Sequence, residues 1–234
     1  MVTFAGHKGG NSLAYSLQRS AEDADLPLVD FVNADNPAMA QKARKRSHSL
    51  RQDKAIAELP AGVEPLPIAA HQLARLPALP VAQSNVVVLG DITERSAILT
   101  DDKLGVYSEF SIHLVKIFKD DQSVLAVGGL VEASRLGGAV RFPSGRIQRY
   151  TVSRVSRQGY PQQGKVYVLF LKRDEDGDFS ILTGYELGST MVNPLDGDPR
   201  PGNDLQFGIY RGVKQELFLT ELQKALRATS GGGD

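Results

Sequence analysis

Two long segments alternate between apolar and polar residues with a period of two, and this restricts the fold more than any other feature of the chain. In GVYSEFSIHLVKIFK (105–119), the apolar set is Val106, Phe110, Ile112, Leu114 and Phe118, and the polar set is Tyr107, Glu109, Ser111 and His113. Side chains of a β-strand point alternately to opposite faces, so this pattern predicts a half-buried strand. NVVVLGDITERSAIL (85–99) predicts a second long strand, with Gly90 as a bulge or bend that lets it serve two sides of a curled sheet.

Further strands are predicted before and after the glycine-containing segment GGAVRFPSGR (137–146). GLVEASRL and IQRYTVSRV are short candidates, and the densely apolar KVYVLFLKR is typical of a central strand. DEDGD then turns the chain into FSILTGY, which is a hairpin signal. The sequence therefore predicts a mainly β domain.

The segments outside these strands divide the chain into five predicted parts. Residues 1–35 suggest a mobile N-terminal arm, 36–58 a basic helix with Lys42, Arg44, Lys45 and Arg46, and 59–80 a proline-rich connector. Residues 81–212 then form the β domain. Residues 213–234 form an amphipathic helix and tail, because Phe218, Leu222, Ala225 and Leu226 make an apolar stripe at helical spacing.

The order of the elements VVVLGDITE, YSEFSIHLVKIFK and GKVYVLFLKRDEDGDFSILTGY resembles that of uncharacterised bacterial proteins with a small β-barrel core. It is also similar to the netrin-like or tissue-inhibitor type of OB barrel, over about Val81 to Leu195. The resemblance implies a small OB-like, partly closed antiparallel barrel, and an envelope or secreted location is common in such bacterial proteins. The chain departs from both patterns, because it has no visible leader and lacks the N-terminal cysteine through which the metalloproteinase inhibitors act.

Composition excludes several classes of function. The chain has no cysteine, which removes disulfides, thiol nucleophiles and cysteine-ligated metals. Lys and Arg total 27 and Asp and Glu total 27, so no overall field attracts nucleic acid or an anionic membrane. No segment reaches the length of a signal-peptide core or a membrane helix. We therefore expect a soluble chain, cytoplasmic if the N-terminus is as given, and in the envelope or secreted if a leader is missing.

Charge is nevertheless unevenly distributed. Residues 133–173 contain nine basic residues and no acid, whereas 174–234 contain eleven acids and five basic residues. Arginines interleaved with aromatic rings are typical of barrels that bind single strands. The candidate ligand-binding residues are Arg135, Arg141, Phe142, Arg146, Arg149, Tyr150, Arg154 and Arg157, with Tyr160 nearby. The alternative is that these arginines pair with acids of neighbouring strands, or are merely solvated.

The glycines of GGAVRFPSGRIQRY (137–150) do not form a phosphate loop. A Walker loop needs a Lys-Ser or Lys-Thr pair before a helix, and a dinucleotide fingerprint needs three spaced glycines. Pro143 and Gly145 instead suit positions i+1 and i+3 of a type I turn.

One strand segment has the residue types for catalysis. Glu109, Ser111 and His113 are two apart and share a strand face, as a base and nucleophile would. A solvated polar face gives the same pattern, and the chain has no Gly-x-Ser-x-Gly elbow. The four histidines show no metal-ligand spacing, and DEDGD lacks the glycine and glutamate positions of a calcium loop.

The sequence therefore favours a non-catalytic binding or interaction module without a cofactor, whose partner is a protein or a component of the envelope. Binding of an anionic polymer, either single-stranded nucleic acid or an acidic polysaccharide, is the first alternative. A hydrolase using Glu109, Ser111 and His113 is the second. The oligomeric state is left open.

Overall fold

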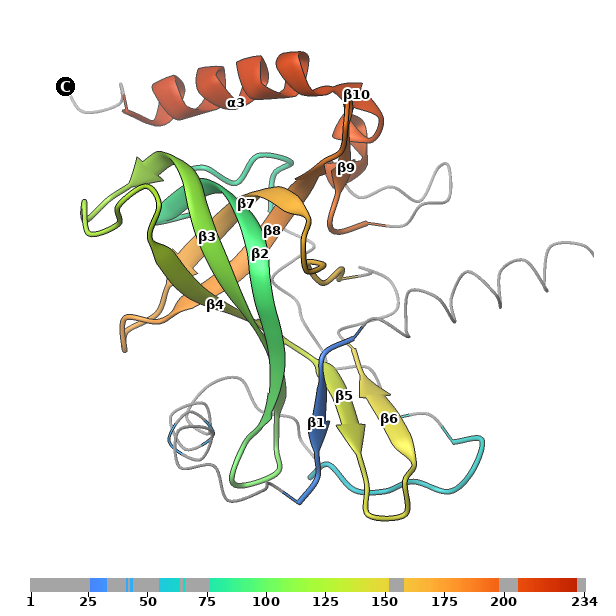
Figure 1. The fold of residues 1–234 in the computed structure, drawn as a ribbon. Helices are drawn as coiled ribbons and strands as arrows, with labels where there is room; N and C mark the ends of the chain where they lie inside the picture. The colour runs from blue at the N-terminus through green and yellow to red at the C-terminus, as the bar shows by residue number, and fades with distance from the viewer. Residues whose placement is uncertain are drawn as a thin grey trace, which may run out of the picture.

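The computed structural model describes residues 26–32, 41, 43, 55–63, 65, 76–151, 158–197 and 206–230. Two β-sheets and a C-terminal helix dominate this part of the chain (Figure 1). The elements are β1 (Leu28–Asp30), β2 (Val86–Leu99), β3 (Val106–Asp120), β4 (Leu130–Leu136), β5 (Gly138–Arg141), β6 (Ile147–Tyr150), β7 (Val166–Arg173), β8 (Phe179–Leu187), β9 (Met191–Pro194), the 3₁₀ helix η2 (Gln206–Tyr210), β10 (Val213–Lys214) and α3 (Gln215–Ser230). The predicted mainly β class, with a packing helix at the C-terminus, is confirmed.

The larger sheet curls into a partly closed ring. β2 pairs antiparallel with both β3 and β7, β3 pairs with β4, and β7 pairs with β8. A short parallel pairing of β4 with β8, at Ala133↔Phe179 and Ser134↔Ser180, closes the circuit. β9 and β10 extend the sheet beyond β8.

Gly90 is the bend that allows β2 to serve both sides of this ring. The pairing register of β2 with β3 shifts between Leu89 and Gly90. A Cβ at Gly90 would lie 2.5 Å from Ile112 Cγ2 and 2.7 Å from the His113 carbonyl oxygen, so the strands approach too closely for any side chain. The predicted bend is confirmed.

Apolar residues occupy both sides of the ring wall. One buried cluster draws alternate residues from all five ring strands and fills the ring, for example Val88, Ile112, Val131, Leu169 and Ile181. A second cluster lies outside it. β7 contributes side chains to both clusters, which explains why its sequence is continuously apolar, as is typical of a central strand.

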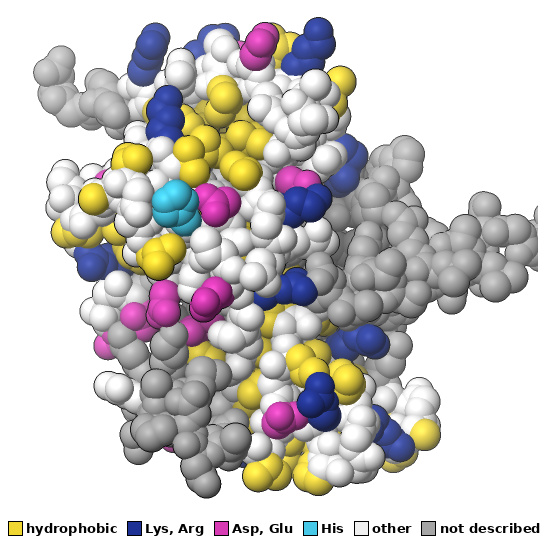
Figure 2. Space-filling model, in the orientation of Figure 1, with side chains coloured by type: hydrophobic (Ala, Val, Ile, Leu, Met, Phe, Trp, Pro, Cys, Tyr) yellow, Lys and Arg dark blue, Asp and Glu magenta, His cyan; other side chains and the backbone are white. Residues whose placement is uncertain are grey.

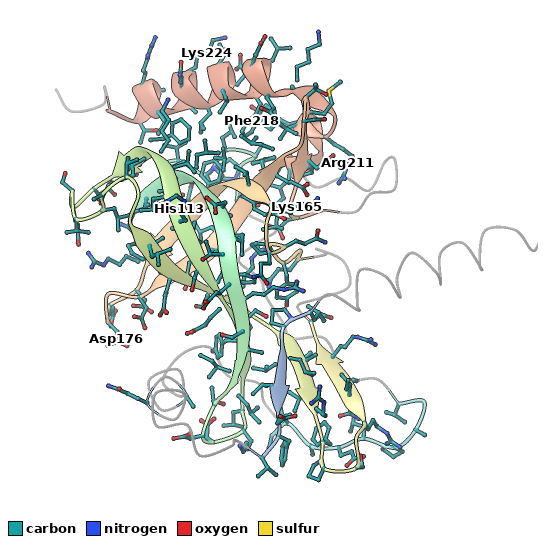
Figure 3. The ribbon with its side chains drawn as sticks, viewed as in Figure 1. His113, Lys165, Asp176, Arg211, Phe218 and Lys224 are labelled. Atoms are coloured by element: carbon teal, nitrogen blue, oxygen red, sulfur yellow. The ribbon has the colours of Figure 1, made fainter. Side chains whose placement is uncertain are left out.

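The C-terminal helix α3 packs on this second cluster. Phe218 and Leu222 are fully buried, and Phe218 contacts Tyr185 of β8 with ring centroids 4.8 Å apart. Figure 3 shows Phe218 directed towards the ring of strands and Lys224 on the opposite face of α3. The predicted apolar stripe is the packing face of the helix.

The glycine and arginine stretch forms a hairpin that lies outside the ring. β5 and β6 form a separate three-stranded sheet with β1. Their connection has the predicted turn: Gly145 N donates to Phe142 O at 2.8 Å. Before the hairpin, Gly137 has φ of 100°, and a Cβ there would lie 2.0 Å from the Tyr160 hydroxyl oxygen. Only glycine fits that position.

Two boundaries predicted from the sequence are wrong. Leu28–Asp30 form strand β1, so this part of the predicted arm is paired rather than mobile. Residues 55–58 belong to no helix, although Gln41 and Ala43 are helical. The rest of the predicted basic helix, including Lys42, lies outside the described residues.

Candidate functional site

The outer face of β2, β3 and β4 carries rows of polar side chains. Glu94 pairs with Ser111, and Ser111 pairs with Glu132. Residues that pair directly across strands face the same side of a sheet, so these three side chains form one row. Ser96 and Glu109 form the neighbouring row.

A bulge places the carboxylates on a common face. Asp91 and Glu94 are three residues apart, so regular alternation would direct them to opposite faces. The register shift between Ile92 and Glu94 inserts Thr93 as an extra residue and restores the shared face. We call Asp91, Glu94, Glu109 and Glu132 the carboxylate face.

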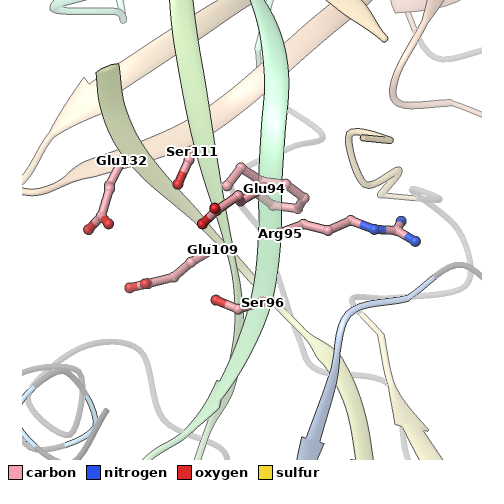
Figure 4. A pocket seen from close by; sticks show the side chains of 7 residues that line it. Glu94, Arg95, Ser96, Glu109, Ser111 and Glu132 are labelled. Carbon is pink, nitrogen blue, oxygen red and sulfur yellow. The ribbon is translucent and has the colours of Figure 1, made fainter. Parts of the chain in front are cut away.

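The carboxylate face contains a hollow of about 110 Å³, drawn in Figure 4. Glu94, Ser96, Glu109, Ser111 and Glu132 direct their side chains to one side, whereas the Arg95 side chain runs away from them. The hollow is lined by Glu94, Arg95, Ser96, Glu109, Phe110, Ser111 and Glu132. Glu109 is only 8% exposed, and both Glu109 and Glu132 make further contacts. Figure 2 shows acidic side chains gathered over β2–β4 beside the histidine.

His113 adjoins this row and is held by an acid. Its Nδ1 lies 2.9 Å from Asp91 Oδ1, and both side chains are partly exposed. The predicted shared face of Glu109, Ser111 and His113 is confirmed, since all three lie on the outer side of β3. Among the described residues, however, no hydrogen bond joins Ser111 to His113, and the acid beside the imidazole is Asp91. Hydrolysis at this face stays a prediction.

Arg135 occupies a buried ion pair instead of a ligand site. Its guanidinium donates to both carboxylate oxygens of Asp196, at 2.9 and 2.5 Å. It also donates to the carbonyl oxygens of Ile181, Leu182 and Gly159. The side chains of Arg135 and Asp196 are 2% and 0% exposed. Arg135 thus bridges β4 and β8 next to their two-residue pairing, and its assignment as a ligand-binding residue is wrong.

The aromatic residues of the arginine segment face the core. Phe142 is 3% exposed and Tyr150 is 4% exposed. Burial raises the pKa of Tyr150 to about 12, and its hydroxyl donates to the Ala57 carbonyl at 3.3 Å. Tyr160 donates to the Leu136 carbonyl at 2.8 Å, and burial raises its pKa as well. The assignment of Phe142 and Tyr150 as ligand-binding residues is therefore wrong, because both side chains are buried.

Three further arginines of this segment, Arg141, Arg146 and Arg149, are described, and they lie on the β5–β6 hairpin or at its turn. Arg141 lies 3.4 Å from Asp30. Arg146 lies 3.8 Å from Glu58 and donates to the Leu59 carbonyl. Arg149 is exposed and makes contacts of its own. Arg154 and Arg157 lie outside the described residues. The alternative of intramolecular pairing thus describes Arg135, Arg141 and Arg146.

The acidic turn after β7 is held by hydrogen bonds between its own residues. Gly177 N donates to Asp174 O, and Asp178 N donates to an Asp174 carboxylate oxygen at 2.8 Å. Within the described ranges, no group of three or more His, Asp or Glu side chains is arranged to hold a metal ion. Figure 3 places Asp176 at the outer end of this hairpin.

Three residues of the carboxylate face were not singled out from the sequence: Asp91, Glu94 and Glu132. The acids themselves are visible in DITE and LVEA, but the bulge that aligns them leaves no mark in a period-two pattern. Comparison with family models, with curated proteins and with solved structures gave no match. No helix in the described part of the chain is long and apolar enough to cross a membrane.

Proposed function

We propose that this protein is a non-catalytic binding module that holds a cationic segment of a partner protein on the carboxylate face. The observation that carries the proposal is the convergence of Glu94, Glu109 and Glu132, with two serines, on one hollow of a sheet face. Carboxylates are acceptors only, so this arrangement complements the donors of a lysine or arginine side chain.

The strand connections support an OB-type barrel, in which this face is the one that takes ligands. The ring order β2-β3-β4-β8-β7, with β7 returning to β2, contains a bent first strand and one parallel pair. OB barrels bind their ligands on the face of the second and third strands, between the loops that follow the first and fourth strands. In this chain those strands are β3 and β4.

The negative charge of the carboxylate face favours a cationic ligand. The face carries four carboxylates, of which Asp91 lies beside His113 and Glu109 and Glu132 make further contacts, and the loop after the fourth ring strand, 174–178, adds more acids. Phosphates would be repelled at such a surface, whereas a cationic segment would be attracted to it. Since a water molecule takes about 30 Å³ of liquid volume, the hollow is large enough for the end of one basic side chain.

A labelled lysine- and arginine-rich octapeptide tests the proposal by fluorescence anisotropy at several salt concentrations. We expect the double variant Glu94→Gln, Glu132→Gln to bind this peptide at least fivefold more weakly than the wild-type chain. The matched control is Glu216→Gln, Glu221→Gln, which removes the same charge from α3, a separate element that contributes no residue to the hollow (Figure 1). It should change the affinity less than twofold.

The proposal fails if both double variants bind the peptide equally. It also fails if a single-stranded oligonucleotide binds the wild-type chain more tightly than the peptide does, because that result would restore the polyanion alternative. Circular dichroism of each variant confirms that the fold is retained.

A further inference from the structure

Strand β1 is a short addition to the edge of the β5–β6 hairpin. It contains three residues and pairs in parallel with β5, through Leu28↔Ala139, Val29↔Val140 and Asp30↔Arg141. Figure 1 shows β1 alongside β5, below the barrel. β1 ends at Asp30 and β2 begins only at Val86, so no tight turn ties β1 to the ring.

Main-chain hydrogen bonds extend the pairing beyond both ends of β1. Ala139 N donates to Pro27 O at 2.8 Å, and Phe31 N donates to Arg141 O at 2.8 Å. Strand addition of this kind obtains affinity from the backbone and specificity from alternate side chains.

The side chains of this segment are matched by the residues around it. Phe31 stacks on Phe142, with ring centroids 4.9 Å apart and an angle of 29° between the planes. Lys103 Nζ donates to the Phe31 carbonyl and lies 5.2 Å from the centre of its ring. Arg141 contacts Asp30, and Val29 packs against the outer apolar cluster. The edge of β5 thus fits an extended aliphatic, acidic and aromatic sequence.

Without β1, the edge of β5 would expose the apolar side chains and backbone groups that residues 27–31 cover. Ala139, Val140 and Phe142 are buried, and the N–H and C=O groups of β5 that pair with β1 would lose their partners. An unpaired apolar edge is a template for another strand. Exchange of an identical element between copies is a low-cost route to a dimer, because every contact is kept.

We propose that the edge of β5 is a strand-acceptor groove, and that residues 27–31 of a second copy of this chain can replace β1 in it. The acceptor is the full chain carrying Val29→Asp, which places a carboxylate against the apolar cluster and displaces its own β1. The probe is a labelled peptide of residues 26–32, LPLVDFV. We expect this variant to bind the peptide at least tenfold more tightly than the wild-type chain, whose groove is filled.

Val32→Asp is the matched control, because it adds the same charge next to the strand at a side chain that is 66% exposed. The Val32→Asp variant should bind the peptide as weakly as the wild-type chain does. A peptide carrying Phe31→Ser should bind the Val29→Asp variant at least fivefold more weakly than the unchanged peptide does. A folded Val29→Asp variant that does not bind the peptide overturns the proposal.

A second measurement applies if Val29→Asp does not fold. The wild-type chain is refolded at high concentration and its mass is followed by light scattering. A dimer that excess peptide converts to monomer supports the groove, and a chain that stays monomeric throughout overturns it.

Discussion

Arg135 and the arginines of the β5–β6 hairpin belong to the same acid-free stretch of sequence, but they have opposite environments. Arg135 is enclosed with Asp196 and donates to three backbone carbonyls. Arg141 and Arg146 lie at the surface, at 3.4 and 3.8 Å from their acids. Residue type alone therefore says little about how much an arginine contributes to the free energy of unfolding. Loss of one partner from a buried ion pair leaves the other charge unpaired and is strongly destabilising, whereas an ion pair exposed to water contributes little.

Removal of Arg135 should have the largest effect. Arg135→Ala leaves the Asp196 carboxylate buried without its ion-pair partner and removes a donor from the carbonyls of Ile181 and Leu182. We expect the free energy of unfolding to fall by about 3–5 kcal/mol, measured by denaturant titration. Asp196→Ala should cost a similar amount, and the double variant should cost less than the sum, because no charge is then stranded. Additive losses would show that the two residues act independently.

Alkaline pH should lower the free energy of unfolding through Tyr150, a buried residue of the same hairpin. Burial raises the pKa of Tyr150 to about 12, above the ordinary value of about 10 that applies in the unfolded chain. Its contribution to stability is therefore complete below pH 10 and is lost as pH rises through about 12. Tyr160 and Tyr185 shift in the same direction.

Denaturant titrations at intervals from pH 8 to 12 measure this loss, and Tyr150→Phe should reduce its slope above pH 10. An unchanged slope would show that the Tyr150 hydroxyl is solvated, contrary to its position in the core.

The surface arginines should have the smallest effect. Arg141→Ala and Arg146→Ala should each change the free energy of unfolding by less than about 1 kcal/mol, since exposed ion pairs are screened by water and salt. The measurement is the same denaturant titration, with Arg135→Ala in parallel. If either change cost as much as Arg135→Ala, the contrast between buried and surface arginines would be wrong.

Elements that depend on local pattern were predictable. Alternation identified β2 and β3, Asp-Gly identified the β7–β8 hairpin, and the helical stripe identified the packing face of α3. The turn at Pro143 and Gly145 followed from the conformations those residues favour.

Features that depend on distant partners were not predictable. Arg135 and Asp196 are 61 residues apart, so nothing local to either one indicates the other. Phe142 stacks on Phe31, the residue after β1, and Tyr150 donates a hydrogen bond to Ala57. These contacts come from segments that were predicted as arm and helix. The carboxylate face needed the extra residue at Thr93, which reverses the side on which Glu94 emerges.

The sequence by itself determined that the chain would form a curled, mainly β domain with a packing helix, because strand and helix periodicities are properties of neighbouring residues. Only the tertiary structure decided which charges are buried in pairs and which lie together on one face of the sheet. Those outcomes depend on strand register and on contacts between distant segments, and a shift of one residue moves a side chain from one face to the other.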